Sequence, residues 1–158
     1  MKALLSILVI LFLGSSYLLI ENLDSTGNVI SIDRKETVFV SKIIDGDTIV
    51  ANGEHIRLLG IDSDERGYDC YKEAKEKMEE WILDKEVELE KDKTDKDQYG
   101  RLLRYVILDG ENINIRLVAN GLAVARFYRD RNYENEILAA EKEAREAKIG
   151  CKWSKTEE

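Results

Sequence analysis

The first residues form the most apolar part of the chain. Lys2 is followed by eighteen residues without a charge, Ala3 to Ile20, and then by Glu21 and Asp24. A run of this length suits a signal peptide and is just long enough to span a bilayer as a helix. A buried core helix at the start of the domain is the alternative. With the cation before the run and the acids behind it, we expect residues 1–22 to be a signal peptide or membrane anchor and the rest to be extracytoplasmic.

The pattern changes after the apolar run. Residues 23–36 are polar and show no periodicity, which predicts a linker. The next segments, TVFVSKIIDGDTIV and HIRLLGID, are rich in apolar and β-branched residues and are separated by Asn52-Gly53. Asn-Gly between two such segments favours a type I′ hairpin turn, and the Asp-Gly-Asp at 45–47 supplies an earlier turn. These signals predict a meander of three strands.

The second half of the chain mixes helical and extended patterns. CYKEAKEKMEEWILD (70–84) has apolar residues at helical spacing, and YENEILAAEKEAREAKIG predicts an amphipathic helix followed by Gly150. Between them, KEVELEKDKTD and RLLRYVILDG predict two strands, the second leading into a turn at Asp109-Gly110. INIRLVANG predicts a short helix ended by Gly121, and LAVARFY a short extended piece.

The predicted order is three strands, a helix, two strands and two helices. Five short strands with an inserted helix are compatible with a small Greek-key barrel of the OB type, although periodicity alone does not select it over another α+β fold. We therefore expect residues 37–154 to form one domain, α+β and mainly β, followed by a tail at 155–158.

Charge limits how this protein can bind a polyanion. The net charge is −8, and removing residues 1–24 removes one lysine and two acids, a net −1, which leaves −7. A domain with this charge is not expected to hold nucleic acid by bulk electrostatics. Any polyanion must therefore be bound at a local site, and we expect that site to contain a metal ion.

Six carboxylates surround one arginine between residues 45 and 65. The acids are Asp45, Asp47, Glu54, Asp62, Asp64 and Glu65. Asp47 and Asp62 lie at ends of neighbouring predicted strands, so the fold can bring them together as oxygen ligands for a hard cation such as Ca²⁺ or Mg²⁺. Each acid taken singly is also explained by turn or helix-cap chemistry.

Arg57 lies within the apolar segment IRLLGI. A buried arginine needs anionic partners, which are either carboxylates of the cluster or a bound phosphate beside a metal. A second arginine, Arg101, follows Tyr99-Gly100, and the only histidine, His55, lies beside a hairpin turn. A catalytic base would therefore be a carboxylate. A metal, a carboxylate base and two arginines are typical of phosphodiester hydrolysis.

Six sequence motifs follow one another along the chain. They are IDGDTI (44–49), IRLLGID (56–62) with Glu65 after it, YKEAKE (71–76), DKTDKDQYGRLLRYV (92–106), LVANGLAVA (117–125) and the ending IGCKW. Together they resemble the thermonuclease, or staphylococcal nuclease-like, family over about residues 38 to 154. The resemblance implies a five-stranded OB-fold Greek-key barrel with three helices. It also implies a calcium-dependent endonuclease that cleaves DNA and RNA to leave 3′-phosphates.

The resemblance also implies roles for individual residues. Asp47 and Asp62 would bind Ca²⁺ with the backbone carbonyl of Ser63, and Asp45 would lie in the outer shell. Glu65 would orient or deprotonate the attacking water.

Two arginines and three aromatic residues complete the implied site. Arg57 would hold a phosphate oxygen and stabilise the transition state, and Arg101 would stabilise the same charge and assist the leaving oxygen. Tyr99 matches a residue that lines the nucleotide pocket. Phe127 and Tyr128 lie where tyrosines contact the substrate, within a stretch, RFYRDRNY, that interleaves arginine with aromatic residues.

Three further features distinguish this chain. Asp64 stands where the family usually has proline, which we expect to loosen the loop and to add a negative charge near the metal. Gln98 stands where a lysine often contacts a terminal phosphate. Cys70 and Cys151 each lie beside a predicted helix end. A disulfide between them is permitted if the domain is outside the cytoplasm, and two free thiols are the alternative.

Two other functions compete with an enzyme. One is a non-catalytic OB-fold module that only binds nucleic acid, and the other is a calcium-stabilised structural domain displayed at the membrane surface. The expected residue type occupies all five key positions, Asp47, Arg57, Asp62, Glu65 and Arg101. This favours a calcium-dependent nuclease, which we expect to be a monomer that acts on DNA and RNA. Its N-terminal segment would engage the membrane or the secretion machinery.

Overall fold

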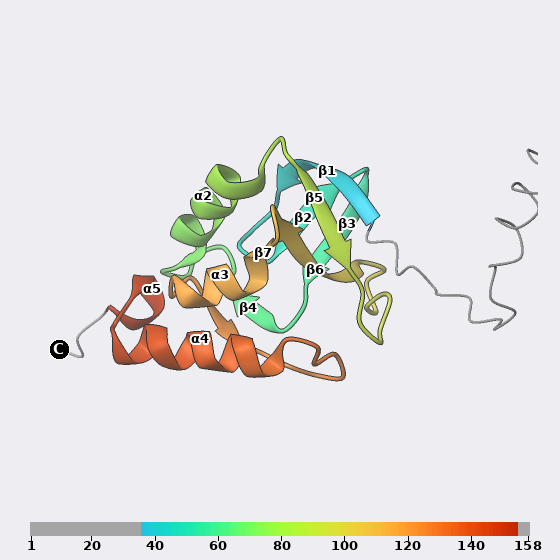
Figure 1. Cartoon of the computed structure of the whole chain (residues 1–158). Coiled ribbons are helices and arrows are strands. Elements are labelled where there is room, and N and C mark those ends of the chain that lie inside the picture. Colours follow the sequence, from blue (N-terminus) through green and yellow to red (C-terminus); the bar gives the residue numbers. More distant parts are fainter. Residues whose placement is uncertain (1–35, 155–158) are drawn as a thin grey trace, which may run out of the picture. The chain divides into compact units, whose positions relative to one another are not determined.

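Five strands close a barrel in the part of the chain that the structure describes (Figure 1). The structure is a computed structural model that describes residues 36–154, so the N-terminal segment 1–22, the linker up to residue 35 and the tail 155–158 lie outside the described residues. The barrel strands are β1 (Glu36–Ile43), β2 (Thr48–Ala51), β3 (Glu54–Leu58), β5 (Glu86–Glu90) and β6 (Leu102–Leu108). They are hydrogen-bonded in the order β3-β2-β1-β5-β6, and parallel pairing of β3 with β6 closes the barrel. The predicted five-stranded OB-type barrel is confirmed.

The two predicted hairpin turns are present. Asn52 and Gly53, between β2 and β3, have φ values of 48° and 83°. Asp109 and Gly110 have φ values of 52° and 83° and connect β6 to the short strand β7 (Glu111–Asn112). Positive φ at both central residues is the signature of a type I′ turn, which matches the twist of the flanking strands.

The predicted third strand is divided in two. Gly60 has a φ of +75°, and a Cβ added there would lie 2.8 Å from side-chain atoms of Ile137 and Phe127. The chain therefore turns sharply after β3, and β4 (Ile61–Ser63) pairs outside the barrel with β8 (Ala123–Ala125). The prediction that Asp62 ends a barrel strand was wrong, because it lies at the centre of β4 instead.

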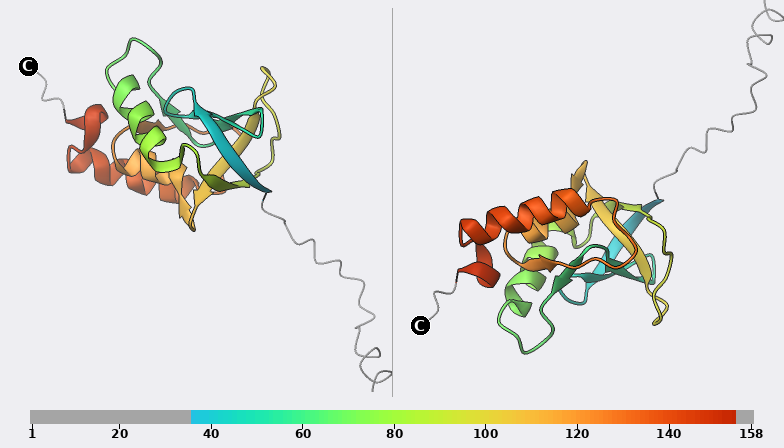
Figure 2. Two further views of the ribbon diagram at one scale, coloured as in Figure 1. Left: turned by 90° about the horizontal axis from the view of Figure 1, so that it is seen from above. Right: turned by 90° about the horizontal axis from the view of Figure 1, so that it is seen from below.

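Helices cover the barrel on two sides (Figure 1). Helix α2 (Tyr71–Ile82) lies on one side, and α3 (Ile113–Ala119) packs against α4 (Glu134–Glu146) on another. These are the three predicted helices. A fourth, the single turn α5 (Gly150–Trp153), follows α4 and lies next to α2 (Figure 2).

Gly150 does not end the amphipathic helix as predicted. Helix α4 stops at Glu146, and Lys148 takes the positive φ of 53° after its end. Gly150 instead begins α5 and lies against Gly121. A Cβ on Gly150 would lie 2.0 Å from the carbonyl oxygen of Asn120. Only glycine permits this close approach between the end of α3 and the start of α5.

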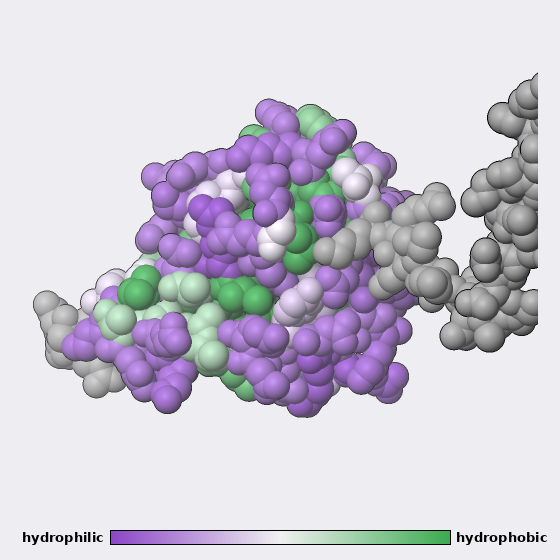
Figure 3. All heavy atoms as spheres, in the orientation of Figure 1, coloured by the Kyte–Doolittle hydropathy of each residue, from purple (hydrophilic) through white to green (hydrophobic). Residues whose placement is uncertain are grey.

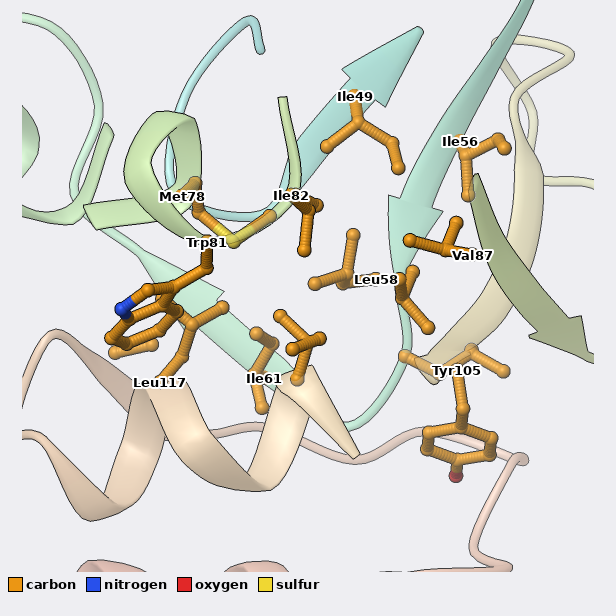
Figure 4. Close-up of a cluster of buried hydrophobic side chains, with 14 of the residues drawn as sticks. Ile49, Ile56, Leu58, Ile61, Met78, Trp81, Ile82, Val87, Tyr105 and Leu117 are labelled. Atoms are coloured by element: carbon orange, nitrogen blue, oxygen red, sulfur yellow. The ribbon is translucent and has the colours of Figure 1, made fainter. Parts of the chain in front are cut away.

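Buried apolar side chains from the barrel strands and from the helices form one core cluster (Figure 4). The four apolar residues at helical spacing in residues 70–84 are all buried, and they are Ala74, Met78, Trp81 and Ile82. They pack with barrel residues that include Ile49 and Leu58. Full burial of a large apolar side chain stabilises the fold by about 1.5–3 kcal/mol. This packing attaches α2 to the barrel.

The face shown in Figure 3 is mostly hydrophilic, with smaller hydrophobic areas among the polar atoms. Within residues 36–154, no helix has the length and apolar character that crossing a bilayer requires. Cys70, just before α2, and Cys151 in α5 form a disulfide across a sequence separation of 81.

Candidate active site

A cleft of about 820 Å³ opens at the rim of the barrel, beside the β3–β4 turn. The loop between β5 and β6 and the chain after β8 form its other walls. Seven of the residues singled out from the sequence line it, and they are Arg57, Asp62, Glu65, Gln98, Tyr99, Arg101 and Tyr128. Residues that are far apart in the sequence are thus brought to one place.

Asp47 lies beneath this cleft and is only 5% exposed. Its Oδ2 accepts a hydrogen bond of 2.6 Å from the backbone N–H of Ser63 on β4, and its Oδ1 accepts one of 3.2 Å from the hydroxyl of Thr48. The backbone N–H of Asp47 in turn donates to Oδ1 of Asp45 at 3.0 Å. The carboxylate of Asp47 therefore joins the turn before β2 to the strand that carries Asp62.

Arg57 bridges the two carboxylates that were predicted to meet. Its Nη1 lies 3.1 Å from Oδ2 of Asp47, and its Nη2 lies 2.9 Å from Oδ1 of Asp62. Nη1 also donates to the carbonyl oxygen of Leu58 at 2.9 Å. Because the Arg57 side chain is only 16% exposed, these anionic partners balance a charge that is largely removed from water.

Burial perturbs the titration of Asp47. Desolvation raises its pKa from 3.8 to about 6, and the negative charge of Asp45 acts in the same direction. The positive charge of Arg57 and the N–H of Ser63 act in the opposite direction. Burial is the largest of these effects, so the folded protein disfavours the charged form of this carboxyl group relative to water.

Asp62 has a second arginine partner that the sequence analysis missed. Nη1 of Arg126 lies 2.6 Å from Oδ2 of Asp62, and the Arg126 guanidinium lies 5.6 Å from the centre of the Tyr128 ring. Arg126 lines the cleft directly after β8. The only signal in the sequence was its place in the arginine–aromatic stretch RFYRDRNY, which does not single out one arginine.

Arg101 is held by an acid that the sequence analysis also missed. Its Nε lies 2.7 Å from Oδ2 of Asp97, while Oδ1 of the same carboxylate accepts the backbone N–H groups of Tyr99 and Arg101. Nη1 of Arg101 reaches the hydroxyl of Thr48 at 3.5 Å. Thr48 also contacts Asp47, so the Arg101 side chain is linked to the buried carboxylate through one hydroxyl group.

Carboxylates join the two loops that carry the tyrosines. Oδ1 of Asp130 accepts the N–H of Thr94 at 2.7 Å, and Oδ2 of Asp92 accepts the N–H of Arg131 at 2.7 Å. These bonds connect the loop before β6 to the loop before α4. The walls of the cleft that present Tyr99 and Tyr128 are therefore fixed to each other.

The three aromatic residues predicted to contact substrate differ in their placement. Tyr99 and Tyr128 line the cleft and are 75% and 72% exposed. Phe127 packs against the hydrophobic core and contacts the position of Gly60, and it does not line the cleft. Phe127 therefore lies apart from the two tyrosines, and its contact with substrate stays a prediction.

The loop after β4 is attached to two helices through Asp64. Oδ1 of Asp64 lies 2.5 Å from Nζ of Lys152, and its Oδ2 accepts the N–H of Cys70 at 3.0 Å. Asp64 therefore connects the loop to α5 and to the start of α2. The positive charge of Lys152 balances the negative charge of the Asp64 carboxylate. The expectation that Asp64 loosens this loop was wrong. Glu65, the next residue, is exposed and lines the cleft.

Comparison with known proteins identifies the family. The sequence model of the family described as staphylococcal nuclease homologue matches residues 55–155. This chain belongs to that family. It is 36% identical to a thermonuclease of Staphylococcus hyicus in an alignment of 133 positions that covers 76% of this chain and 77% of the relative. It is also 36% identical to a thermonuclease of Staphylococcus intermedius, over 73% of this chain and 76% of the relative. Endonuclease YncB of Bacillus subtilis is 33% identical over 75% of this chain and 62% of its own length.

The staphylococcal nuclease resemblance implies a calcium ion, and the donor atoms suit one. Asp47 and Asp62 contact the same guanidinium, so their carboxylates lie close together, and both supply the oxygen atoms that hard cations prefer. Residues 36–154 contain no group of three or more His, Cys, Asp or Glu side chains placed to hold a metal.

Proposed function

We propose that this chain is a calcium-dependent endonuclease of the staphylococcal nuclease family that hydrolyses phosphodiester bonds in DNA and RNA and leaves 3′-phosphate ends. The observation that carries the proposal is the bridge from Arg57 to Asp47 and Asp62, beneath a cleft that also presents Glu65 and Arg101. Arginines, paired carboxylates and one exposed acid are the groups that phosphodiester hydrolysis needs. The thermonuclease and endonuclease names of the relatives support the same activity.

The carboxylates of Asp47 and Asp62 would hold Ca²⁺ together with the backbone carbonyl of Ser63, with Asp45 in the outer shell. When bound, the ion supplies positive charge next to the phosphate. This local charge matters because the chain carries a net charge of −8 and would otherwise repel a polyanion.

Glu65 is the group proposed to accept a proton from the attacking water. The water oxygen would bond to phosphorus as its proton passes to the Glu65 carboxylate, and the bond from phosphorus to the 5′ oxygen would break. The departing 5′ oxygen would take a proton from solvent to become a hydroxyl group, and Glu65 would release its proton to solvent. This sequence leaves the phosphate on the 3′ oxygen. The exposure of Glu65 at the cleft gives its carboxylate access to water and substrate.

Arg57 and Arg101 would balance the charge that develops on the phosphate oxygens. Both guanidinium groups line the cleft, and carboxylates fix both of them in place before substrate binds. Donors that are already oriented stabilise a transition state at little reorganisation cost. Arg101 would also assist the departing 5′ oxygen.

Tyr99 and Tyr128 are proposed to bind the bases or sugars next to the scissile bond. Each exposed ring carries an arginine neighbour, with the Arg101 guanidinium 5.5 Å from the Tyr99 ring centre and that of Arg126 5.6 Å from the Tyr128 ring centre. Stacking on aromatic rings is tolerant of sequence, and arginine adds attraction for the backbone phosphates. These contacts suit a nuclease without strong base preference.

We also propose that the protein acts outside the cytoplasm, as a secreted or membrane-anchored monomer. The Cys70–Cys151 disulfide supports this location, because disulfides persist in oxidising compartments. The apolar run within residues 1–22 supports it independently.

The experiment incubates the full-length oxidised chain with end-labelled single-stranded DNA and single-stranded RNA, in Ca²⁺ or in excess chelator. We expect cleavage of both in Ca²⁺ and none in chelator. DNA products should resist extension by a DNA polymerase until a 3′-phosphatase has treated them. Binding without cleavage would replace the proposal with a nucleic-acid-binding module. If the chain binds Ca²⁺ but neither binds nor cleaves nucleic acid, a structural calcium-binding domain would replace the proposed nuclease.

A further inference from the structure

The exposed loop that carries Glu65 has both ends attached to the last helix. We call residues 64–70 the Glu65 loop. Residues 65–69 are exposed, whereas Asp64 is half-buried and Cys70 is buried. The loop therefore has few core contacts of its own, and the contacts at its two ends help to hold it in position.

Adjacent residues of α5 hold those two ends. Cys151 forms the disulfide with Cys70, and Nζ of Lys152 lies 2.5 Å from Oδ1 of Asp64. Oδ2 of Asp64 accepts the N–H of Cys70 at 3.0 Å, so the two ends of the loop are also bonded to each other. One covalent bond, one ion pair and one hydrogen bond thus meet at the base of the Glu65 loop.

The ion pair is not an ordinary surface pair. The side chains of Lys152 and Asp64 are only 18% and 22% exposed, so water screens their attraction less than it would on an open helix face. Helix α5 itself is fixed to the rest of the domain. The N–H of Lys152 donates to the carbonyl oxygen of Gly121 at 3.0 Å, and Gly150 lies against the same segment.

We propose that Lys152 and Asp64 are positioning residues for the nuclease reaction, and that with the Cys70–Cys151 disulfide they hold the Glu65 carboxylate at the cleft. This inference rests on the proposed function, because it assigns a task to groups that support Glu65. Glu65 is one peptide bond away from Asp64, so any shift of Asp64 moves the carboxylate directly. A misplacement of about 1 Å at a reacting group can cost about a hundredfold in rate.

The test compares Lys152→Met with Lys142→Met in the oxidised full-length chain. Lys142 also pairs with an acid, Glu146, but on the exposed surface of α4. We expect Lys152→Met to lower kcat for single-stranded DNA by about ten- to a hundredfold with KM within about twofold of wild type. We expect Lys142→Met to leave both unchanged.

Two further variants separate positioning from general stability. Lys152→Arg keeps the charge and should retain most of the activity. The double variant Lys152→Met/Asp64→Asn should lose no more than the worse single variant, because both remove the same interaction. Amide hydrogen exchange reports the loop directly. It should become faster at residues 65–69 in Lys152→Met and stay unchanged in Lys142→Met.

Removing the disulfide tests independently whether α5 holds the Glu65 loop in position. Cys70→Ser/Cys151→Ser should show the same faster exchange at residues 65–69 and a lower kcat. If that variant fails to fold, Lys152→Met alone decides.

The inference is overturned if Lys152→Met cleaves at the wild-type rate while a Glu65→Gln variant is inactive, or if exchange at residues 65–69 does not change. If the wild-type chain cleaves no nucleic acid, the proposed function has failed. In that case hydrogen exchange still shows whether α5 holds the loop.

Discussion

Arg57 and Asp62 form an ion pair of 2.9 Å across the turn at which the chain leaves the barrel. Arg57 lies on β3 of the barrel, whereas Asp62 lies on β4 of the small outer sheet. One guanidinium therefore joins two separate sheets and also reaches the buried Asp47. The same contacts that stabilise the fold at this point bring together the charged groups of the candidate site.

Replacing Arg57 by lysine should harm both activity and stability. Lysine keeps the positive charge but loses the planar fork that reaches two carboxylates at once. We expect the cleavage rate to fall by about 10²–10³-fold, which is typical for loss of a transition-state donor. We also expect about 1.5–3 kcal/mol of lost stability from the weakened charged hydrogen bonds.

Rates of DNA cleavage and urea unfolding curves measure both effects. Arg116→Lys is the matched control, because Arg116 also pairs with a carboxylate, that of Glu111, but does not line the cleft, and this variant should keep the wild-type cleavage rate. A wild-type cleavage rate in Arg57→Lys would show that the guanidinium takes no part in the reaction.

Asp62→Asn should weaken calcium binding. The variant keeps the shape of the side chain and an oxygen atom but loses one negative charge, and the number of charged ligands tunes calcium affinity. We expect the Kd for Ca²⁺, measured by titration calorimetry without nucleic acid, to rise by about tenfold or more. The control Asp109→Asn changes an exposed acid in a hairpin turn with φ of 52°, a conformation that asparagine tolerates. Equal affinities in the two variants would exclude Asp62 as a ligand.

The exposed tyrosines should contribute to substrate binding rather than to the fold. Base stacking on an aromatic ring is worth about 1–3 kcal/mol. Tyr99→Ala and Tyr128→Ala should therefore each raise KM by about five- to a hundredfold and leave the melting temperature unchanged.

Phe127→Ala is the contrasting variant. Because Phe127 packs against the core, its truncation should lower the melting temperature and change KM little. Steady-state kinetics and thermal unfolding distinguish the two classes. A rise in KM for Phe127→Ala that equals the rise for the tyrosine variants would show that Phe127 also contributes to substrate binding.

Local signals in the sequence predicted most of the barrel. Asn52-Gly53 marked a type I′ turn because asparagine and glycine tolerate positive φ. The apolar spacing in residues 70–84 marked a helix because a period of 3.6 places those residues on one face. The motifs around Asp47, Arg57 and Asp62 predicted which charges would meet, and the structure brings them together.

The missed features depend on contacts between distant segments. The break between β3 and β4 occurs at Gly60, which packs against Ile137 and Phe127. These contacts join distant segments, so no local sequence pattern predicts them. The bond from Arg126 to Asp62 spans 64 residues, and that from Lys152 to Asp64 spans 88. Helix α5 is a single turn of four residues, too short to display a helical period.

The central claim is that the cleft hydrolyses phosphodiester bonds with Glu65 as the base. Its most direct test is the single-turnover rate of cleavage of single-stranded DNA in saturating Ca²⁺ by the wild-type chain, Glu65→Gln and Glu54→Gln. Glu54 is an exposed acid on β3 that does not line the cleft. We predict that Glu65→Gln slows cleavage by about 10²–10⁴-fold, while Glu54→Gln keeps the wild-type rate. Equal rates for wild type and Glu65→Gln would contradict the account.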